Sequence, residues 1–147
     1  MTTSEISLLD TNVLVYAADR SSPFYQACVA LRDKGLRGEI SLCVCPQVLN
    51  EFFAIVTDPK RVVNPRSPEE GADEMEKYFR AENILKIYPG AEIIEKTLKL
   101  LKQYKTTKQA IFDLQLLATM LSNNITCLYT YNQQDFSKFK EIEALTP

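Results

Sequence analysis

Four acidic side chains stand next to apolar segments of the chain. Asp10 ends the apolar run at residues 5–9, and Glu51 lies among bulky apolar neighbours. Asp113 begins another apolar segment, and Asp135 follows a fourth. Carboxylates that converge without histidine or cysteine form a site for a hard cation such as Mg²⁺ or Mn²⁺, which prefer oxygen ligands. A bound cation activates water near neutral pH and neutralises charge on a phosphoryl oxygen, so such a site suits phosphodiester hydrolysis.

The chain of 147 residues contains no histidine. This absence excludes Ser-His-Asp hydrolases, His-Cys proteases, histidine-based nucleases and most zinc enzymes. Four cysteines stand in apolar segments without the C-x-x-C spacing of zinc or redox sites, and we interpret them as reduced core residues: Cys28, Cys43, Cys45 and Cys127. Any catalysis must therefore use carboxylates, hydroxyls, lysines or a hard metal.

The segments that carry the acids alternate between short apolar runs and longer amphipathic stretches. Strands are predicted at 5–9, 40–45, 84–88, 125–130 and, for a short fifth one, 142–145. Helices are predicted at 23–36, 46–57, 67–83, 91–104 and 110–122. This alternation predicts a single domain over residues 1–147, a three-layer α/β/α sandwich with a central, mainly parallel sheet.

Local signals place the ends and inner faces of three helices. Ser22 is the predicted N-cap of the helix at 23–36, and Ser67 to Glu70 form a predicted capping box. The predicted inner face of the helix at 67–83 consists of Ala72, Met75 and Phe79. The predicted inner face of the helix at 91–104 consists of Ile94, Leu98 and Leu101.

Each acid lies near the carboxyl end of a predicted strand or in the first turns of a helix. In a parallel sheet these points share one edge, where α/β proteins bind ligands. Structural roles also remain open: Asp10 as a helix N-cap, Glu51 as a solvated charge, Asp113 at a helix dipole and Asp135 in an Asx turn. One shared acidic site accounts for all four positions more simply than four separate roles.

The overall charge of the chain gives little sign of nucleic-acid binding. The formal net charge is −2, and the basic residues nearest to one another in loops are Lys60, Arg61 and Arg66. No apolar stretch approaches the ~20 residues of a membrane span, and the first residues lack the basic start of a signal peptide. We therefore expect a cytoplasmic protein without a membrane segment.

Four motifs, in order and over nearly the whole chain, resemble the PIN-domain ribonucleases of the VapC toxin type. They are residues 8–16 (LLDTNVLVY), 50–52 (NEF), 112–119 (FDLQLLAT) and 130–136 (TYNQQDF). The resemblance implies a PIN-like fold, Mg²⁺- or Mn²⁺-dependent endoribonuclease activity on RNA, a small antitoxin partner and a homodimer. It also suggests that the helices at 46–57 and 67–83 make the dimer and antitoxin contacts.

The resemblance also assigns roles to individual residues. Asp10, Glu51 and Asp113 match the metal-binding acids, and Asn12 and Thr130 match groups that orient the first of them. The fourth acid is open between two positions: some members carry it where this chain has Asn132, and Asp135 follows three residues later. We assign it to Asp135, with Asn132 as a polar support.

Two other functions fit part of the pattern. A haloacid-dehalogenase-type phosphatase has a second aspartate two residues after the first, where this chain has Asn12, and we reject it. A PIN-like module that binds RNA or protein without cleaving is the alternative. The presence of Asp10, Glu51 and Asp113 argues against it, because unused buried carboxylates are costly.

Overall fold

The computed structural model describes residues 5–147 and contains a sheet of five strands in the order β3-β2-β1-β4-β5. The strands are β1 (Ser7–Leu9), β2 (Leu42–Val44), β3 (Ile84–Lys86), β4 (Cys127–Tyr129) and β5 (Glu143–Leu145). Every neighbouring pair is parallel, and Leu8 of β1 is in register with Cys43 on one side and Leu128 on the other. The sheet predicted as mainly parallel is therefore parallel throughout the described residues.

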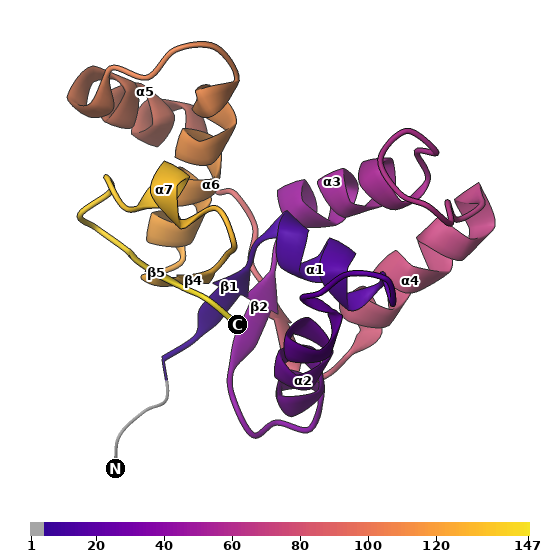
Figure 1. Cartoon of the computed structure of the whole chain (residues 1–147). Helices are drawn as coiled ribbons and strands as arrows, with labels where there is room; N and C mark the ends of the chain where they lie inside the picture. Colours follow the sequence, from indigo (N-terminus) through magenta and orange to yellow (C-terminus); the bar gives the residue numbers. More distant parts are fainter. Residues whose placement is uncertain (1–4) are drawn as a thin grey trace.

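Helices cover both faces of this sheet (Figure 1). They are α1 (Thr11–Ala17), α2 (Tyr25–Leu36), α3 (Pro46–Val56), α4 (Pro68–Arg80), α5 (Ile93–Tyr104), α6 (Ile111–Ser122) and α7 (Gln133–Phe136), with a short 3₁₀ turn at Lys108–Ala110. Helices α1 to α4 gather on one side, and α5 to α7 on the other. The three-layer α/β/α sandwich is confirmed.

The direction of the strand order reverses between β1 and β4. The chain steps from β1 to β2 to β3 and then returns past β1 to β4 and β5. Parallel connections are almost always right-handed, so the returning helices lie on the opposite face from the first four. The reversal opens a crevice at the carboxyl ends of β1 and β4, the place where such sheets bind ligands.

The inner strands β1 and β2 are apolar because they are buried on both faces. Leu8, Leu9, Leu42, Cys43 and Val44 have no solvent-exposed surface. The core continues into α3 through Phe52 and into α6 through Leu114 and Leu117. All four cysteines are buried and free, as predicted. Within residues 5–147, no helix has the length and apolar character needed to cross a bilayer.

Two details of the predicted helices on the α1–α4 face are wrong. The N-cap of α2 is Phe24, and the Ser22 hydroxyl instead accepts a hydrogen bond from the Phe24 amide at 3.1 Å. In α4 the capping box of Ser67 and Glu70 is present, but the buried residues are Gly71 and Tyr78, while Phe79 is 53% exposed. Tyr78 is buried because its ring packs edge-on against Phe52 of α3.

Two further differences concern the opposite face. In α5 the buried residue is Leu100, while Ile94 and Leu98 of the predicted inner face are exposed. Helix α5 packs on α6 at the outside of the molecule (Figure 1), and these two side chains face solvent. Asp135, predicted in a loop, lies in the short helix α7.

Candidate active site

The carboxylate of Asp10 lies at the strand-order reversal and is only 7% exposed. Its Oδ1 accepts a hydrogen bond from the Thr11 amide at 2.8 Å and so caps α1. Its Oδ2 accepts from the Thr130 hydroxyl at 2.7 Å and from the Asn12 amide group at 3.3 Å. The helix cap therefore uses one carboxylate oxygen, and the side chains of Thr130 and Asn12 bind the other.

Asn12 and Thr130, predicted to orient the first acid, both contact it and each other. The Asn12 Nδ2 atom donates to Thr130 Oγ1 at 3.3 Å, and its Oδ1 accepts from the Tyr131 amide at 3.2 Å. Thr130 Oγ1 also accepts from the backbone amide of Asn132 at 2.9 Å. This network joins β1, α1 and the segment after β4 around one carboxylate, which limits its freedom to turn.

Glu51 of α3 is held by two residues that sequence reasoning missed. Thr11 Oγ1 donates to Glu51 Oε2 at 2.9 Å, and Gln47 Nε2 donates to Glu51 Oε1 at 3.2 Å. The same Gln47 nitrogen reaches the carbonyl of Phe112 at 3.0 Å, which ties α3 to the start of α6. The spacing of Gln47 four residues before Glu51 was a usable signal, because such pairs meet on one helix face.

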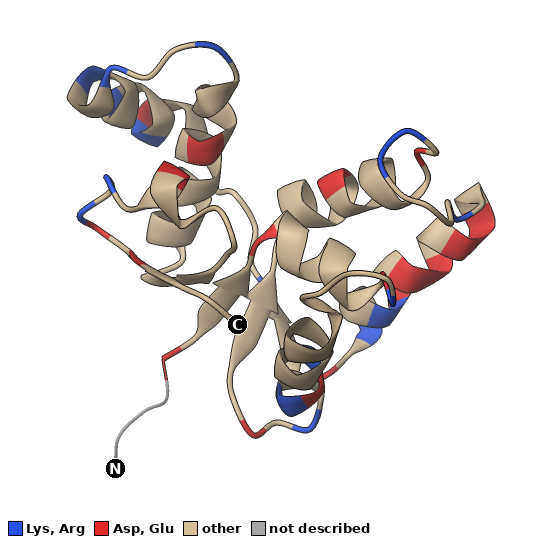
Figure 2. Ribbon diagram, viewed as in Figure 1, with Lys and Arg blue, Asp and Glu red and all other residues tan. Residues whose placement is uncertain are grey.

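Three of the four predicted acids line one cavity of about 330 Å³. Its lining includes Asp10, Glu51 and Asp113, together with Asn132 and the cation Arg61. Asp135 does not line it, although Asn132 does. Figure 2 shows acidic positions on α3, α6 and α7 and at the end of β1, with basic positions on α5 and between α3 and α4. We call the cavity of about 330 Å³ the acid pocket.

Burial and the charges of neighbouring carboxylates disfavour the charged forms of Asp10 and Asp113. Burial raises the pKa of Asp10, although the hydrogen bonds from Thr130 and Thr11 oppose the rise. The pKa of Asp113 is raised to about 6, first by burial and then by the charges of Asp135 and Asp10, while Lys138 lowers it. Asp135 therefore acts on the pocket through its charge although it is exposed.

The donor set of the acid pocket suits a hydrated hard cation. Among residues 5–147, no three Asp, Glu or Cys side chains are close enough together to coordinate one ion directly. Mg²⁺ usually keeps several waters and uses one or two carboxylates, so direct contact with three is not required. Asp10 is a buried carboxylate whose pKa is raised by desolvation, and a cation would offset that cost.

The raised pKa of Asp113 predicts an unusual pH dependence of stability. Between pH 3.8 and about 6 the folded protein keeps a proton that the unfolded chain has released. The unfolded state then binds fewer protons, so this carboxyl lowers the unfolding free energy as pH rises through that window. With a metal chelator present, the melting temperature of the wild type should decline from pH 4 to pH 7 when it is compared with that of Asp113→Asn at each pH. Parallel profiles of the two proteins would contradict this expectation.

The hydrogen bond from Thr11 to Glu51 gives a second prediction. Thr11→Val keeps the shape of the buried side chain and removes the donor. We expect the activity that this site supports to fall by roughly 10- to 100-fold, the usual cost of losing a group that orients a metal-binding side chain. Initial rates of the wild type and the variant measure this loss. Thr97→Val is the control, because the Thr97 hydroxyl donates to the Ile93 carbonyl within α5. Equal losses in both variants would contradict a role of Thr11 in the site.

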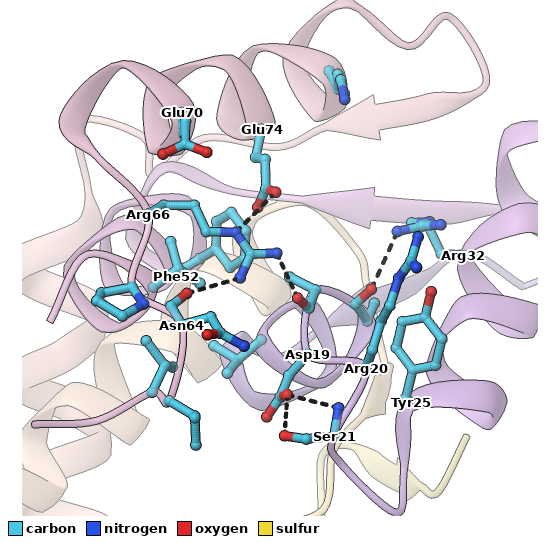
Figure 3. A pocket seen from close by; sticks show the side chains of 18 of the residues that line it. Asp19, Arg20, Ser21, Tyr25, Arg32, Phe52, Asn64, Arg66, Glu70 and Glu74 are labelled. Atoms are coloured by element: carbon cyan, nitrogen blue, oxygen red, sulfur yellow. Dashed lines mark hydrogen bonds and ion pairs between the residues drawn. The ribbon is translucent and has the colours of Figure 1, made fainter. Parts of the chain in front are cut away.

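Figure 3 shows a second and larger cavity, of about 740 Å³. Its lining shares Val15 with that of the acid pocket. Arg66 crosses it, donating to Glu74 Oε1 at 3.3 Å and to the Ala18 carbonyl at 2.5 Å. The other carboxylate oxygen of Glu74 is buried and has no hydrogen-bond partner. This cavity lies between the end of α1, helices α2 and α4, and the segment between α3 and α4.

A parallel sheet with an acidic pocket at its strand-order reversal defines an α/β protein with a ligand site at the carboxyl edge. The family model of the PIN domain matches residues 7–142, and the chain belongs to this family. The predicted family is thereby confirmed.

Curated relatives of similar length include two from Mycobacterium tuberculosis. Ribonuclease VapC24 is 26% identical over 131 residues, which are 89% of each chain. Ribonuclease VapC48 is 23% identical over 138 residues, 94% of each chain.

Solved structures share the fold at low identity. VapC20 of Mycobacterium tuberculosis, described as a sarcin-ricin loop cleaving toxin, has a TM-score of 0.66 at 13% identity, covering 94% of this chain and 98% of that one. VapBC2 from Rickettsia felis, solved bound to a DNA fragment from the VapBC2 promoter, has a TM-score of 0.65 at 19% identity. The match covers 97% of this chain and 98% of that one.

Proposed function

We propose that the protein is a metal-dependent endoribonuclease that hydrolyses RNA phosphodiester bonds, the toxin of a toxin–antitoxin pair. The observation that carries this proposal is the buried carboxylate of Asp10 at the strand-order reversal, in one pocket with Glu51 and Asp113. Membership of the PIN family and relatives named as ribonucleases support it.

Mg²⁺ or Mn²⁺ is the cofactor we propose, held by Asp10, Glu51, Asp113 and the fourth acid Asp135, in part through its bound waters. When bound, it supplies a nucleophilic water near neutral pH and neutralises charge on the phosphoryl oxygens. The chain's own groups fix the carboxylates: Thr130 and Asn12 hold Asp10, while Thr11 holds Glu51. Arg61, the cation of the pocket lining, is suited to bind an RNA phosphate.

The test of this function is cleavage of single-stranded RNA by the purified protein with and without Mg²⁺ or Mn²⁺. We expect cleavage only with the metal. The alternative, a PIN-like module that binds without cleaving, predicts neither cleavage nor a rise in melting temperature at millimolar metal, because only a bound ion stabilises the folded state by mass action.

The fourth acid position gives a prediction that separates two neighbouring side chains. We assign the position to Asp135, whose charge acts on Asp113, although Asn132 is the one that lines the pocket. Asp135→Ala should therefore weaken Mn²⁺ binding severalfold more than Asn132→Ala, because only the former removes a negative charge. Calorimetric titration with Mn²⁺ measures both, and the reverse ranking would overturn the assignment.

The proposed protein partner is a small antitoxin. Solved structures of the same fold include one described as a toxin–antitoxin complex, from Klebsiella pneumoniae. The larger cavity lies next to α3 and α4, the helices that the resemblance points to, and offers both apolar and charged walls to an antitoxin segment.

We further propose a homodimer that acts in the cytoplasm, where its RNA substrate is found. The outward apolar side chains of α5 support a protein contact there as well, since Ile94 is 73% exposed and Leu98 is 51% exposed.

A further inference from the structure

Three aromatic rings pack together beside the acid pocket. Tyr16 lies in α1, Phe24 precedes α2 and Tyr131 follows β4. The ring centroids of Phe24 and Tyr131 are 4.3 Å apart at an interplanar angle of 33°. Tyr16 contacts both, with centroids 5.1 Å from Phe24 and 5.3 Å from Tyr131. We call these three rings the aromatic cluster.

The aromatic cluster is fixed relative to the first acid. Tyr16 lines the acid pocket itself. The Tyr131 amide donates to Asn12 Oδ1, and Asn12 donates in turn to Asp10 Oδ2. The Tyr131 hydroxyl accepts from the thiol of Cys28, a buried residue of α2, at 3.7 Å. Because of these bonds, a ligand that stacks on the rings is held at a set position relative to the carboxylates.

Part of the cluster faces solvent. Phe24 is 39% exposed, while Cys28, about one turn further along the chain, is fully buried. A partly exposed ring anchored beside a polar pocket offers a stacking surface, since every nucleobase has a π-face that can lie on an aromatic side chain.

We propose that the aromatic cluster binds a nucleobase of the RNA strand whose phosphodiester lies in the acid pocket, with Phe24 as the exposed stacking ring. This inference rests on the proposed ribonuclease function and names the form of its substrate. The ring of Tyr16 belongs to both surfaces, so a chain of alternating phosphates and bases spans them, with Arg61 available to a phosphate. The rings match the bases of RNA, Arg61 matches a phosphate, and the acids face the strand through the proposed metal ion.

The substrate class follows from the stacking. A base can stack on Phe24 only when it is free of its neighbours in a helix, so the cluster selects single-stranded RNA or loops over duplexes. Stacking tolerates any base, because it does not read hydrogen-bonding edges. The cluster therefore selects the state of the strand rather than its sequence.

The chain contains no tryptophan, which allows a direct optical test. Phe24→Trp places the one indole in the cluster, and Phe79→Trp places it at a matched exposed position of α4 that lines neither cavity. The probe is a short single-stranded RNA of mixed sequence in Ca²⁺, which takes the same oxygen ligands as Mg²⁺ with looser geometry. Anisotropy of a fluorescein-labelled copy reports binding, and a gel confirms that the RNA is intact.

We expect the RNA to quench the indole of Phe24→Trp and to leave that of Phe79→Trp unchanged, while a duplex of the same strand quenches neither. Phe24→Leu should weaken binding by roughly 5- to 100-fold, the effect of losing one stacked base, and Phe79→Leu by less than about twofold. The quenching result does not depend on how well Phe24→Leu folds.

Several results would overturn the inference. One is bound RNA without quenching of Phe24→Trp; another is equal quenching at both positions. A Phe24→Leu protein that binds RNA like wild type but loses its antitoxin would show that the cluster is a protein contact. Absence of RNA binding by the wild type, seen in the anisotropy, marks failure of the ribonuclease proposal itself, which is distinguishable from failure of the cluster alone.

Discussion

Asp10→Asn is expected to reduce RNA cleavage at least about a thousandfold while the protein stays folded. The asparagine keeps an oxygen for the Thr11 amide, but its NH₂ group faces Thr130 and Asn12, which already supply hydrogen atoms to this carboxylate. The variant also removes the buried charge that we propose holds the cation. Metal-based charge stabilisation amounts to several kcal/mol, and each ~1.4 kcal/mol is a factor of ten in rate.

Single-turnover cleavage of a labelled RNA in Mg²⁺ measures this loss, and circular dichroism checks the fold. Burial raises the pKa of Asp10, so replacing the charge with a neutral amide offsets part of the lost hydrogen bonding. Asp33→Asn is the matched control, because Asp33 pairs with Arg32 on α2 and lines neither cavity. Full activity of Asp10→Asn would contradict the proposed mechanism.

The second large effect is expected in living cells. Induced expression of the wild-type chain should arrest bacterial growth. Cells that express Asp113→Asn should grow as fast as cells that carry an empty vector. Asp113 lines the acid pocket, and its pKa of about 6 reflects burial and the nearby charges of Asp135 and Asp10. The variant relieves this repulsion, so its abundance should match that of the wild type.

Growth curves and immunoblots of both proteins separate loss of activity from loss of protein. Asp33→Asn should arrest growth as the wild type does. If Asp113→Asn is equally toxic at equal abundance, Asp113 is not needed for toxicity. If the wild-type chain leaves growth unchanged, the toxin proposal is contradicted while the nuclease assay remains independent of it.

Local signals in the sequence were sufficient for the layered parallel fold and for most of the acid pocket. Buried strands of a parallel sheet are continuously apolar, and helices repeat their apolar face, so both patterns are visible along the chain. Asp10, Glu51 and Asp113 follow from their places at strand ends and helix starts, since parallel strands bring those points to one edge. The capping box at Ser67 is equally local.

Local patterns failed where distant segments decide the surroundings of a side chain. The inner faces of α4 and α5 depend on what packs against them, so Phe79 and Ile94 are exposed although their spacing is helical. Gln47 is visible to sequence reasoning only as a helical neighbour of Glu51, because its bond to the Phe112 carbonyl spans 65 positions.

The sequence by itself determined the class of chemistry: four carboxylates in a chain without histidine, on an alternating α/β pattern. Tertiary structure alone decided how those acids are held and what adjoins them. Segments far apart in the chain meet in the hydrogen bond from Thr11 to Glu51 and in the packing of Tyr16, Phe24 and Tyr131. They also meet in the lining of the acid pocket, which includes Asn132 and does not include Asp135. Such contacts depend on the pairing of β1 with β4 and on the helices around them, and no local periodicity encodes that geometry.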